Sequence, residues 1–327
     1  GLTRRVSRPD LLLLAALFHD LGKGGPGDHS ETGAAIVTEL GGRLGLSLVD
    51  AERLGLLVRH HLLLPAMATR RDLDDPTTID AVARACGSVE VLDLLAALTE
   101  ADATAAGPLA WSPMRARLVA ELVTRARLVL GGKRFRKPPA LEPAQKELAQ
   151  STTLAVRMDL PGEPDGSCRV TVVVPGRADA LAPVAGVLAV HRLDVRAATI
   201  QTAGGRAVQV WHASTGFRGP PGADVLRTDI ARALDGGVDL AAKLRARAGE
   251  RRRRVVAHAD PHVEVLPGAS ADATVIEVRA HDTAGLLYRL VSAIAECRAV
   301  VRSAVVGTLG AEAVDVFYLV DSHGKQL

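Results

Sequence analysis

Six side chains of the kinds that bind metal ions lie in four short stretches of the first third of the sequence. They are His19, Asp20, His29, His60, His61 and Asp102. Imidazole nitrogens combined with carboxylate oxygens suit a divalent ion such as Mn, Fe, Mg or Zn. An ion held there would lower the pKa of a bound water molecule. The residue types therefore predict a divalent-metal site.

Helical spacing places two of these ligands among apolar residues. Asp102 follows Leu98 by four positions, and His61 follows Val58 by three. A lone buried carboxylate is costly unless it is paired or coordinated. An inward His, an inward Asp and a His-Asp pair on three helices make the kind of metal site that helix bundles build. Each residue also has a simpler interpretation, as a core histidine, a helix-capping Asp or, for His29, part of a turn.

The first part of the chain has the periodicity of helices. Leu, Ala and Arg dominate residues 1–131, and apolar residues recur every three or four positions. Glycines interrupt the first helix after Asp20, and Gly131-Gly132 end the last helix. A stretch rich in glycine, proline and basic residues follows. We expect four segments: a helical domain over 1–132, a linker over 133–165, and two further domains over 166–268 and 269–327.

The region after the linker is an internal duplication with strand periodicity. Each copy predicts a strand, a helix and a hairpin of two strands. The first copy continues into a second helix and a last strand at 262–266, which gives the order βαββαβ. The second copy ends after its hairpin, so we expect it to be truncated and the chain to be part of a longer protein. The matching residues include Val195 with Val301, Ala198 with Ala304, Val208 with Val314, and Trp211 with Phe317.

The composition fits a globular protein and excludes several classes of function. Hydrophobic residues make up 48% and charged residues 24% of the chain, which rules out disorder along its whole length. Aromatic residues make up only 2%, so a platform for stacking bases is excluded, and a net charge of +3 does not demand nucleic acid. No apolar run is long enough for a membrane helix. Three widely spaced cysteines favour a reducing cytoplasm over a disulfide framework.

The motif His19-Asp20-Leu21-Gly22-Lys23, together with His60-His61 and Asp102, resembles the HD superfamily of metal-dependent phosphohydrolases. Neighbouring motifs narrow the resemblance to the bifunctional uridylyltransferase/uridylyl-removing family, which modifies PII signalling proteins. In that family two ACT domains follow the HD domain. The resemblance implies an all-α HD domain followed by two ferredoxin-like βαββαβ ACT domains, the second truncated. The neighbouring motifs are Gly27-Asp28-His29-Ser30, His60-His61-Leu62, Ala68–Asp72 and Leu98–Ala106.

The resemblance also implies a reaction and roles for residues. The reaction is hydrolysis of the phosphodiester that joins a nucleotide to a tyrosine of PII, which removes a uridylyl or an adenylyl group. Mn or Mg is the expected ion, with Fe or Zn as alternatives. Asp20 would bridge two metals while His19 holds one, and Lys23 would contact a phosphate oxygen. Arg71 and Asp72 would support the site as a pair, although Lys23 and Arg71 can equally be solvated charges.

Two features depart from the family pattern. Its leading HD histidine should precede His19, but residues 1–18 contain no histidine. The nucleotidyltransferase domain is absent, so we do not expect this chain to add nucleotides. One alternative is therefore a catalytically inactive fragment that senses glutamine. Another is an HD hydrolase of a free nucleotide such as guanosine tetraphosphate, although the short linker before the duplicated region argues against it.

By the same resemblance, the ACT domains bind glutamine as an allosteric effector where the first strand meets the first helix. In the second copy, Asp282 would accept the ammonium group, and Gly285 and Leu286 would bring the start of a helix to the carboxylate. Asp282 can alternatively cap that helix. The first copy offers Gly176 and Arg177 at this loop. An unfinished sheet in the second copy predicts a weak homodimer through the ACT domains.

Overall fold

The computed structural model divides the chain into two compact units, residues 1–137 and residues 138–327. Each unit has its own hydrophobic core and is described by itself. Among the helices that the structure describes, none is long and apolar enough to cross a membrane. The structure describes residues 6–24, 27–107, 110–111, 113–135, 141–160, 166–175, 180–203, 206–215, 219–250, 260–309 and 312–327.

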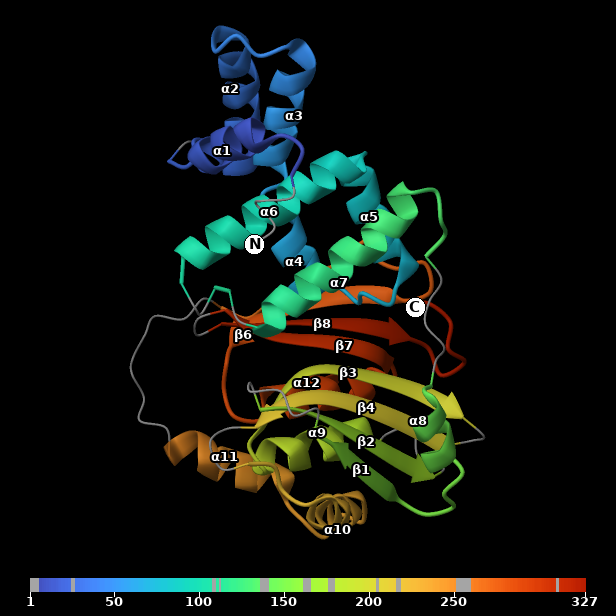
Figure 1. Ribbon diagram of the computed structural model, residues 1–327. Helices are drawn as coiled ribbons and strands as arrows, with labels where there is room; N and C mark the ends of the chain where they lie inside the picture. Colours follow the sequence, from blue (N-terminus) through green and yellow to red (C-terminus); the bar gives the residue numbers. More distant parts are fainter. Residues whose placement is uncertain are drawn as a thin grey trace. The chain divides into compact units, whose positions relative to one another are not determined.

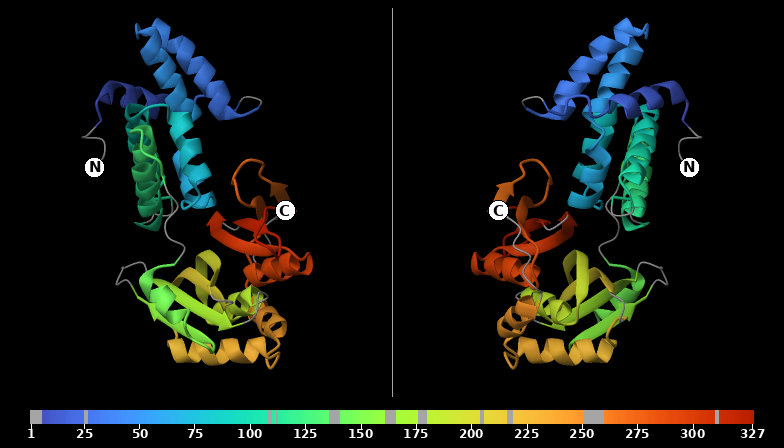
Figure 2. Two further views of the ribbon diagram at one scale, coloured as in Figure 1. Left: turned by 90° about the vertical axis from the view of Figure 1, so that its right-hand side faces the viewer. Right: turned by 90° about the vertical axis from the view of Figure 1, so that its left-hand side faces the viewer.

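The first unit is built from helices, as the periodicity predicts. Several helices start at a side chain that accepts a backbone N–H of its own first turn, as Asp28, Ser47, Asp75 and Ser88 do. Helices α2 and α3 pack along each other as an antiparallel pair (Figure 2). The helices are α1 (Pro9–Phe18), α2 (His29–Arg43), α3 (Leu48–Arg59), α4 (Leu63–Arg70), α5 (Pro76–Cys86), α6 (Val89–Ala105) and α7 (Pro113–Leu130).

The core of this unit is aliphatic. The predicted apolar face of α6 is buried, and Leu98 is 1% exposed. Val58, which precedes His61 by three positions, is buried as well. Helix α3 ends at Arg59, however, so His61 follows the helix instead of lying on it. Aliphatic residues from α1, α3, α5, α6 and α7 fill the interior. This core fixes the helix ends from which the metal-type ligands project.

The second unit is one antiparallel sheet of eight strands with helices, in the order β1-β2-β4-β3-β7-β8-β6-β5 (Figure 1). Both copies of the duplication contribute to this single sheet. The strands are β1 (Ala155–Asp159), β2 (Ser167–Pro175), β3 (Leu193–Ala203), β4 (Arg206–Thr215), β5 (His262–Val265), β6 (Thr274–His281), β7 (Val300–Leu309) and β8 (Glu312–Val320). The helices are α8 (Pro143–Leu148), α9 (Leu181–Val190), α10 (Ala223–Leu234), α11 (Leu240–Glu250) and α12 (Leu286–Glu296).

The two copies meet at β3 and β7, and the pairing there is symmetric. Ala198 lies opposite Ala304, which is its own counterpart in the duplication. The irregularity in β3 after Val195 recurs in β7 after Val301. Helices α9 and α12 also pack on each other. The second unit therefore consists of two ACT-like ferredoxin halves related by a pseudo-twofold axis through the Ala198–Ala304 pair.

One predicted connection is wrong. The strand at 262–266, expected to close the first copy, is β5, and it pairs with β6 of the second copy. The edge position of the first copy is taken by β1, which lies inside the stretch expected to be a linker and pairs with β2. The second copy therefore does not leave the sheet unfinished beside β6. Because β5 covers that edge, no unfinished sheet remains there to support the predicted weak homodimer.

The two faces of the sheet are covered differently. The larger core lies between one face and helices α9 to α12, with Trp211 and Phe317 from matching strands at its centre. The opposite face carries two smaller clusters, one around Val316 and Tyr318 and one where Leu141 packs on Val173. A polar side chain on the helix-covered face is consequently shielded from water.

Candidate metal centre

The His19-Asp20 pair lies at the end of α1, where the chain turns away from the helix. Helix α1 ends at Phe18, and the backbone N–H groups of Leu21 and Lys23 donate to the carbonyls of Phe18 and Asp20. Lys23 therefore does not lie on a helix with His19. The turn nevertheless brings Lys23 to the site, because its Nζ donates to Asp20 Oδ2 at 2.6 Å.

Gly22 lets this turn cross α2 at close range. A Cβ atom at residue 22 would lie 2.0 Å from the carbonyl oxygen of His29 and 2.7 Å from the backbone nitrogen of Gly33. Only glycine permits this approach, which positions His29 relative to Asp20. The sequence identifies Gly22 as a helix breaker, but it carries no signal for this backbone contact.

Backbone carbonyls orient two of the histidines. Nδ1 of His19 lies 2.9 Å from the carbonyl oxygen of Ala16, and Nδ1 of His61 lies 2.7 Å from that of Val58. A carbonyl oxygen can only accept, so Nδ1 carries the proton in both rings. In the neutral rings Nε2 then presents a lone pair, which is the arrangement of a metal-binding histidine fixed by its other nitrogen.

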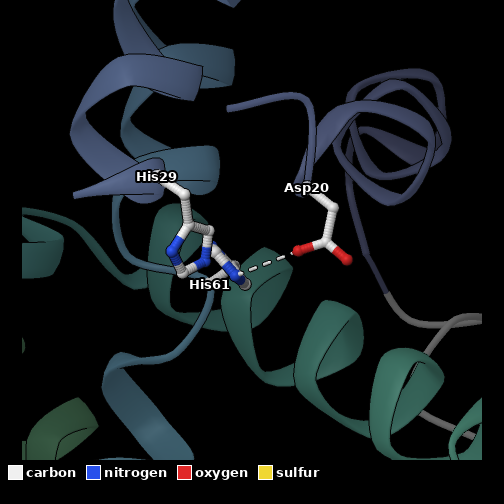
Figure 3. A group of neighbouring side chains, drawn as sticks. All are labelled: Asp20, His29 and His61. Atoms are coloured by element: carbon white, nitrogen blue, oxygen red, sulfur yellow. Dashed lines mark ion pairs between the residues drawn. The ribbon is translucent and has the colours of Figure 1, made fainter. Parts of the chain in front are cut away.

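These lone pairs face other acceptors. Nε2 of His19 lies 3.4 Å from Asp20 Oδ2 and 3.4 Å from Asp102 Oδ1. Nε2 of His61 lies 3.9 Å from Asp20 Oδ1 (Figure 3). Acceptors that converge without a shared proton repel each other unless a cation lies between them. Separations of about 3–4 Å are those expected for ligand atoms that each lie about 2 Å from one ion.

His29 completes the group from the start of α2. One ligand atom from each of Asp20, His29 and His61 lies within 4.8 Å of the others. Nε2 of His29 is buried and has no hydrogen-bond partner among the residues that the structure describes. A buried polar atom without a partner needs an explanation, and a coordinated ion supplies one. The donor set therefore fits a divalent metal.

The protonation states also suit metal binding. Partial burial opposes ionisation of Asp20, but the hydrogen bond and the positive charge of Lys23 oppose this effect, and the pKa of Asp20 lies below its usual range. Burial lowers the pKa of His61, which keeps its imidazole neutral. An ionised carboxylate and a neutral imidazole are the forms that bind metal.

Five of the six predicted ligands come together, and the sixth lies beside them. His61 is 4% exposed, as its spacing predicts. Asp102 contacts His19, but its side chain is 42% exposed, because it lies near the end of α6 and not inside the core. His60 is outside the close group and lines a cavity of about 510 Å³ together with His29. Burial and the adjacent Arg59 lower the pKa of His60.

The supporting residues Arg71 and Asp72 lie just after α4. Arg71 donates to the carbonyl of Arg70, and Asp72 accepts the backbone N–H of Asp74. These contacts are local to the turn between α4 and α5. Their pairing near the metal centre stays a prediction.

The predicted effector loop of the second copy begins α12. Gly285 has a left-handed backbone with φ of 78°, and α12 starts without a side-chain cap. Asp282 therefore does not cap α12. A Cβ atom at residue 285 would lie 2.8 Å from Cδ1 of Leu244, so α11 packs directly on this loop. Leu286 opens the helix, whereas Gly176 and Arg177 of the first copy lie outside the described residues.

Comparison with known proteins agrees with this geometry. Residues 2–107 match the HD domain family. The first unit is thus an HD domain, a hydrolase class whose members bind divalent metals, and Asp20, His29 and His61 form its candidate metal triad.

Over its whole length, the chain is a relative of the bifunctional uridylyltransferase/uridylyl-removing enzymes. It is 43% identical to the enzyme of that name from Streptomyces coelicolor, over 100% of this chain and 45% of the relative. Identity is 39% to the one from Mycobacterium tuberculosis H37Rv, over 97% of this chain and 41% of the relative. The enzyme of that name from Gluconobacter oxydans is 31% identical, over 97% of this chain and 39% of the relative. The chain spans less than half the length of these curated relatives.

Proposed function

We propose that this chain removes a nucleotidyl group from a tyrosine of a PII signalling protein, in a reaction that depends on a divalent metal. The observation that carries the proposal is the convergence of histidine ring nitrogens on the carboxylate of Asp20 in an HD domain. The names of the relatives support uridylyl as the group removed. We place the reaction in the cytoplasm, which agrees with three free cysteines.

His19, Asp20, His29, His61 and Asp102 would hold the metal, with Mn or Mg as the preferred ion. The bound ion supplies an acidified water and offsets the charge of the phosphate. The bond between phosphorus and the tyrosine oxygen breaks, a water oxygen takes its place, and the phenolate takes up a proton as it leaves. The products are a nucleoside monophosphate and an unmodified tyrosine.

The surrounding residues would position the substrate. Lys23 neutralises Asp20 in the absence of substrate and can turn its ammonium toward a phosphate oxygen. The cavity beside His29 offers Ser30, Arg59 and His60 as polar contacts for the substrate. Arg59 is held there by an ion pair with Glu31 at 2.9 Å. Arg71 and Asp72 would support this side of the site.

We further propose that the sheet unit regulates the reaction by binding glutamine. The ACT-like halves and the uncapped start of α12 support this part of the proposal. The helical unit then carries the chemistry, and the duplicated unit carries the effector site.

The test is release of UMP from uridylylated PII by this chain in the presence of Mn, with and without L-glutamine. We expect release that rises with L-glutamine, and a loss of at least about 100-fold in the Asp20→Ala variant. Asp229→Ala is a matched control, because Asp229 also faces a histidine Nε2, that of His191 at 2.7 Å, but lies in the sheet unit. Absence of release by the folded chain, or full release by Asp20→Ala, would contradict the proposal.

A further inference from the structure

A cavity of about 510 Å³ lies beside the candidate metal centre, between the first turn of α2 and the segment that joins α3 to α4. His29 belongs both to the wall of this cavity and to the metal triad. A molecule in the cavity therefore borders the metal ligands. A volume of this size is typical of sites for small molecules, and it is too small to receive the face of a folded protein.

The two sides of the metal centre differ in how open they are. Asp20 comes from the end of α1 and His29 from the start of α2 (Figure 3). On the α1 side, the side chains of Asp20 and Lys23 are 40% and 62% exposed. On the α2 side, Ser30 in the cavity wall is only 8% exposed. The open side can receive a protein, whereas the cavity can receive only a small group that the protein carries.

Arg59 and Leu62 give the cavity a flat cation and an apolar surface. Arg59 is the last residue of α3, and its Nε donates to Glu31 Oε2 at 2.9 Å. A hydrogen bond from Nε lies in the plane of the guanidinium, so it orients the group without covering its faces. Leu62 is large and apolar, yet 45% exposed. A flat ring of low polarity can cover both surfaces.

The flat ring that matches these surfaces is a nucleobase. Proteins stack bases on aromatic side chains or on the guanidinium plane of arginine. None of the described residues that line the cavity is Phe, Tyr or Trp. The imidazoles of His29 and His60 are also planar, but His29 is one of the metal triad. An ion pair as exposed as that of Arg59 with Glu31 adds little to stability, so its main effect is to orient the guanidinium at the cavity wall.

We propose that this cavity holds the nucleoside part of the substrate, with the base stacked on the guanidinium face of Arg59 and covering Leu62. The protein that carries the modified tyrosine then approaches from the open α1 side. Arg59 is a positioning residue in this assignment, because it contacts the base and not the bond that breaks. The inference deepens the proposed function, since it divides the substrate between the two sides of the metal centre, and it rests on that function.

The test is isothermal titration calorimetry of the full chain in the presence of Mn with two probes, UMP and ribose 5-phosphate. Ribose 5-phosphate lacks the base but keeps the sugar and the phosphate. We expect the wild-type chain to bind UMP at least about tenfold more tightly than ribose 5-phosphate. In Arg59→Ala, the affinity for UMP should fall at least about tenfold, and the affinity for ribose 5-phosphate should stay the same. Arg59→Lys keeps the charge but loses the plane, so it should behave like Arg59→Ala.

Two further variants separate contact with the base from a structural role of the ion pair. Glu31→Ala breaks the pair but leaves the guanidinium in the chain, so the affinity for UMP should fall by no more than about threefold. Arg53→Ala is the matched control, because Arg53 lies on the same helix and forms an ion pair with Glu90 at 3.3 Å, but is outside the described lining of the cavity. It should leave the affinities for both probes unchanged.

Several results would overturn the assignment. They are equal affinities of the wild-type chain for the two probes, wild-type binding of UMP by Arg59→Ala or Arg59→Lys, an equal loss in Glu31→Ala or Arg53→Ala, and no binding of UMP at millimolar concentration. If the chain releases UMP from uridylylated PII but binds both probes equally, the proposed function stands and this inference fails. If binding depends on the base but no UMP is released from PII, the proposed function fails and the cavity remains a nucleotide site.

Discussion

In the candidate metal centre, single backbone carbonyls determine which ring nitrogen of two histidines carries the proton. The carbonyls of Ala16 and Val58 hold the protons of His19 and His61 on Nδ1, so that both Nε2 atoms are free to coordinate. His29 reaches the same place from the start of α2, with its Nε2 buried. The ligand set therefore depends on where α1, α2 and α3 start or end as much as on the residue types.

Asp315 has a titration that can be measured. Its folded pKa is about 7, whereas an unfolded Asp titrates near 4, so the folded chain binds one more proton between these pH values. Stability must then fall as pH rises from about 4 to about 7 and level off above that. Relative to Asp315→Asn, the wild-type sheet unit should lose about 2–3 kcal/mol between pH 5 and pH 7, without ligand.

Urea unfolding at a series of pH values measures this difference. Trp111→Phe in every variant leaves Trp211, which is buried in the sheet unit, as the reporter of unfolding. Asp224→Asn on the surface of α10 serves as a control and should follow the wild type at every pH, because its side chain is 94% exposed. Parallel pH profiles for the wild type and Asp315→Asn would contradict the prediction.

Among the elements, the helix ends of the sheet unit show how far the duplication extends. Arg192 follows α9 and Arg298 follows α12, and both have left-handed backbones, with φ of 62° and 60°. This position after a helix is usually occupied by glycine, because a side chain there costs about 1–2 kcal/mol. The shared conformation at two arginines indicates that the turn geometry of the ancestral unit has been kept in both copies.

Arg192→Gly and Arg298→Gly should each stabilise the sheet unit by about 0.5–1 kcal/mol. Glycine removes the strain of the left-handed conformation, and the free energy gained exceeds the cost of the greater conformational entropy that glycine gives the unfolded chain. Arg227→Gly provides the opposite case, since Arg227 is exposed inside α10 and glycine there should cost about 1 kcal/mol. Urea unfolding reported by Trp211 distinguishes the three variants, and loss of stability in both turn variants would refute the argument.

The sequence predicts the elements better than their connections. Periodicity identifies the buried face of α6, and the duplication predicts the matched strands that meet at Ala198 and Ala304. The sequence pattern does not show that β5 joins the second copy. Strand pairing depends on contacts between distant residues, and a short apolar run does not specify its partner strand. Likewise, residue types predict the candidate ligands, but the contact of Lys23 with Asp20 depends on a turn after α1, which the residue types do not predict.

At the scale of the whole molecule, the proposed catalytic site and the proposed effector site lie in two units with separate cores. The metal-type ligands all belong to residues 1–137, and the proposed amino-acid site belongs to residues 138–327. Leu244 and Asp282 come from different copies of the sheet unit, so that site requires the complete duplicated region. Each unit should therefore fold and bind its own ligand when made separately.

Separate production of the two units tests this division. Mn at about 100 times its Kd should stabilise residues 1–137 by about 2.7 kcal/mol and leave residues 138–327 unchanged, and L-glutamine should do the reverse. UMP release should persist in residues 1–137 but no longer respond to L-glutamine, because the effector site is gone. A response to L-glutamine in residues 1–137 would place the effector site in the helical unit. Failure of residues 138–327 to bind L-glutamine, while the full chain does bind it, would show that the helical unit supplies part of that site.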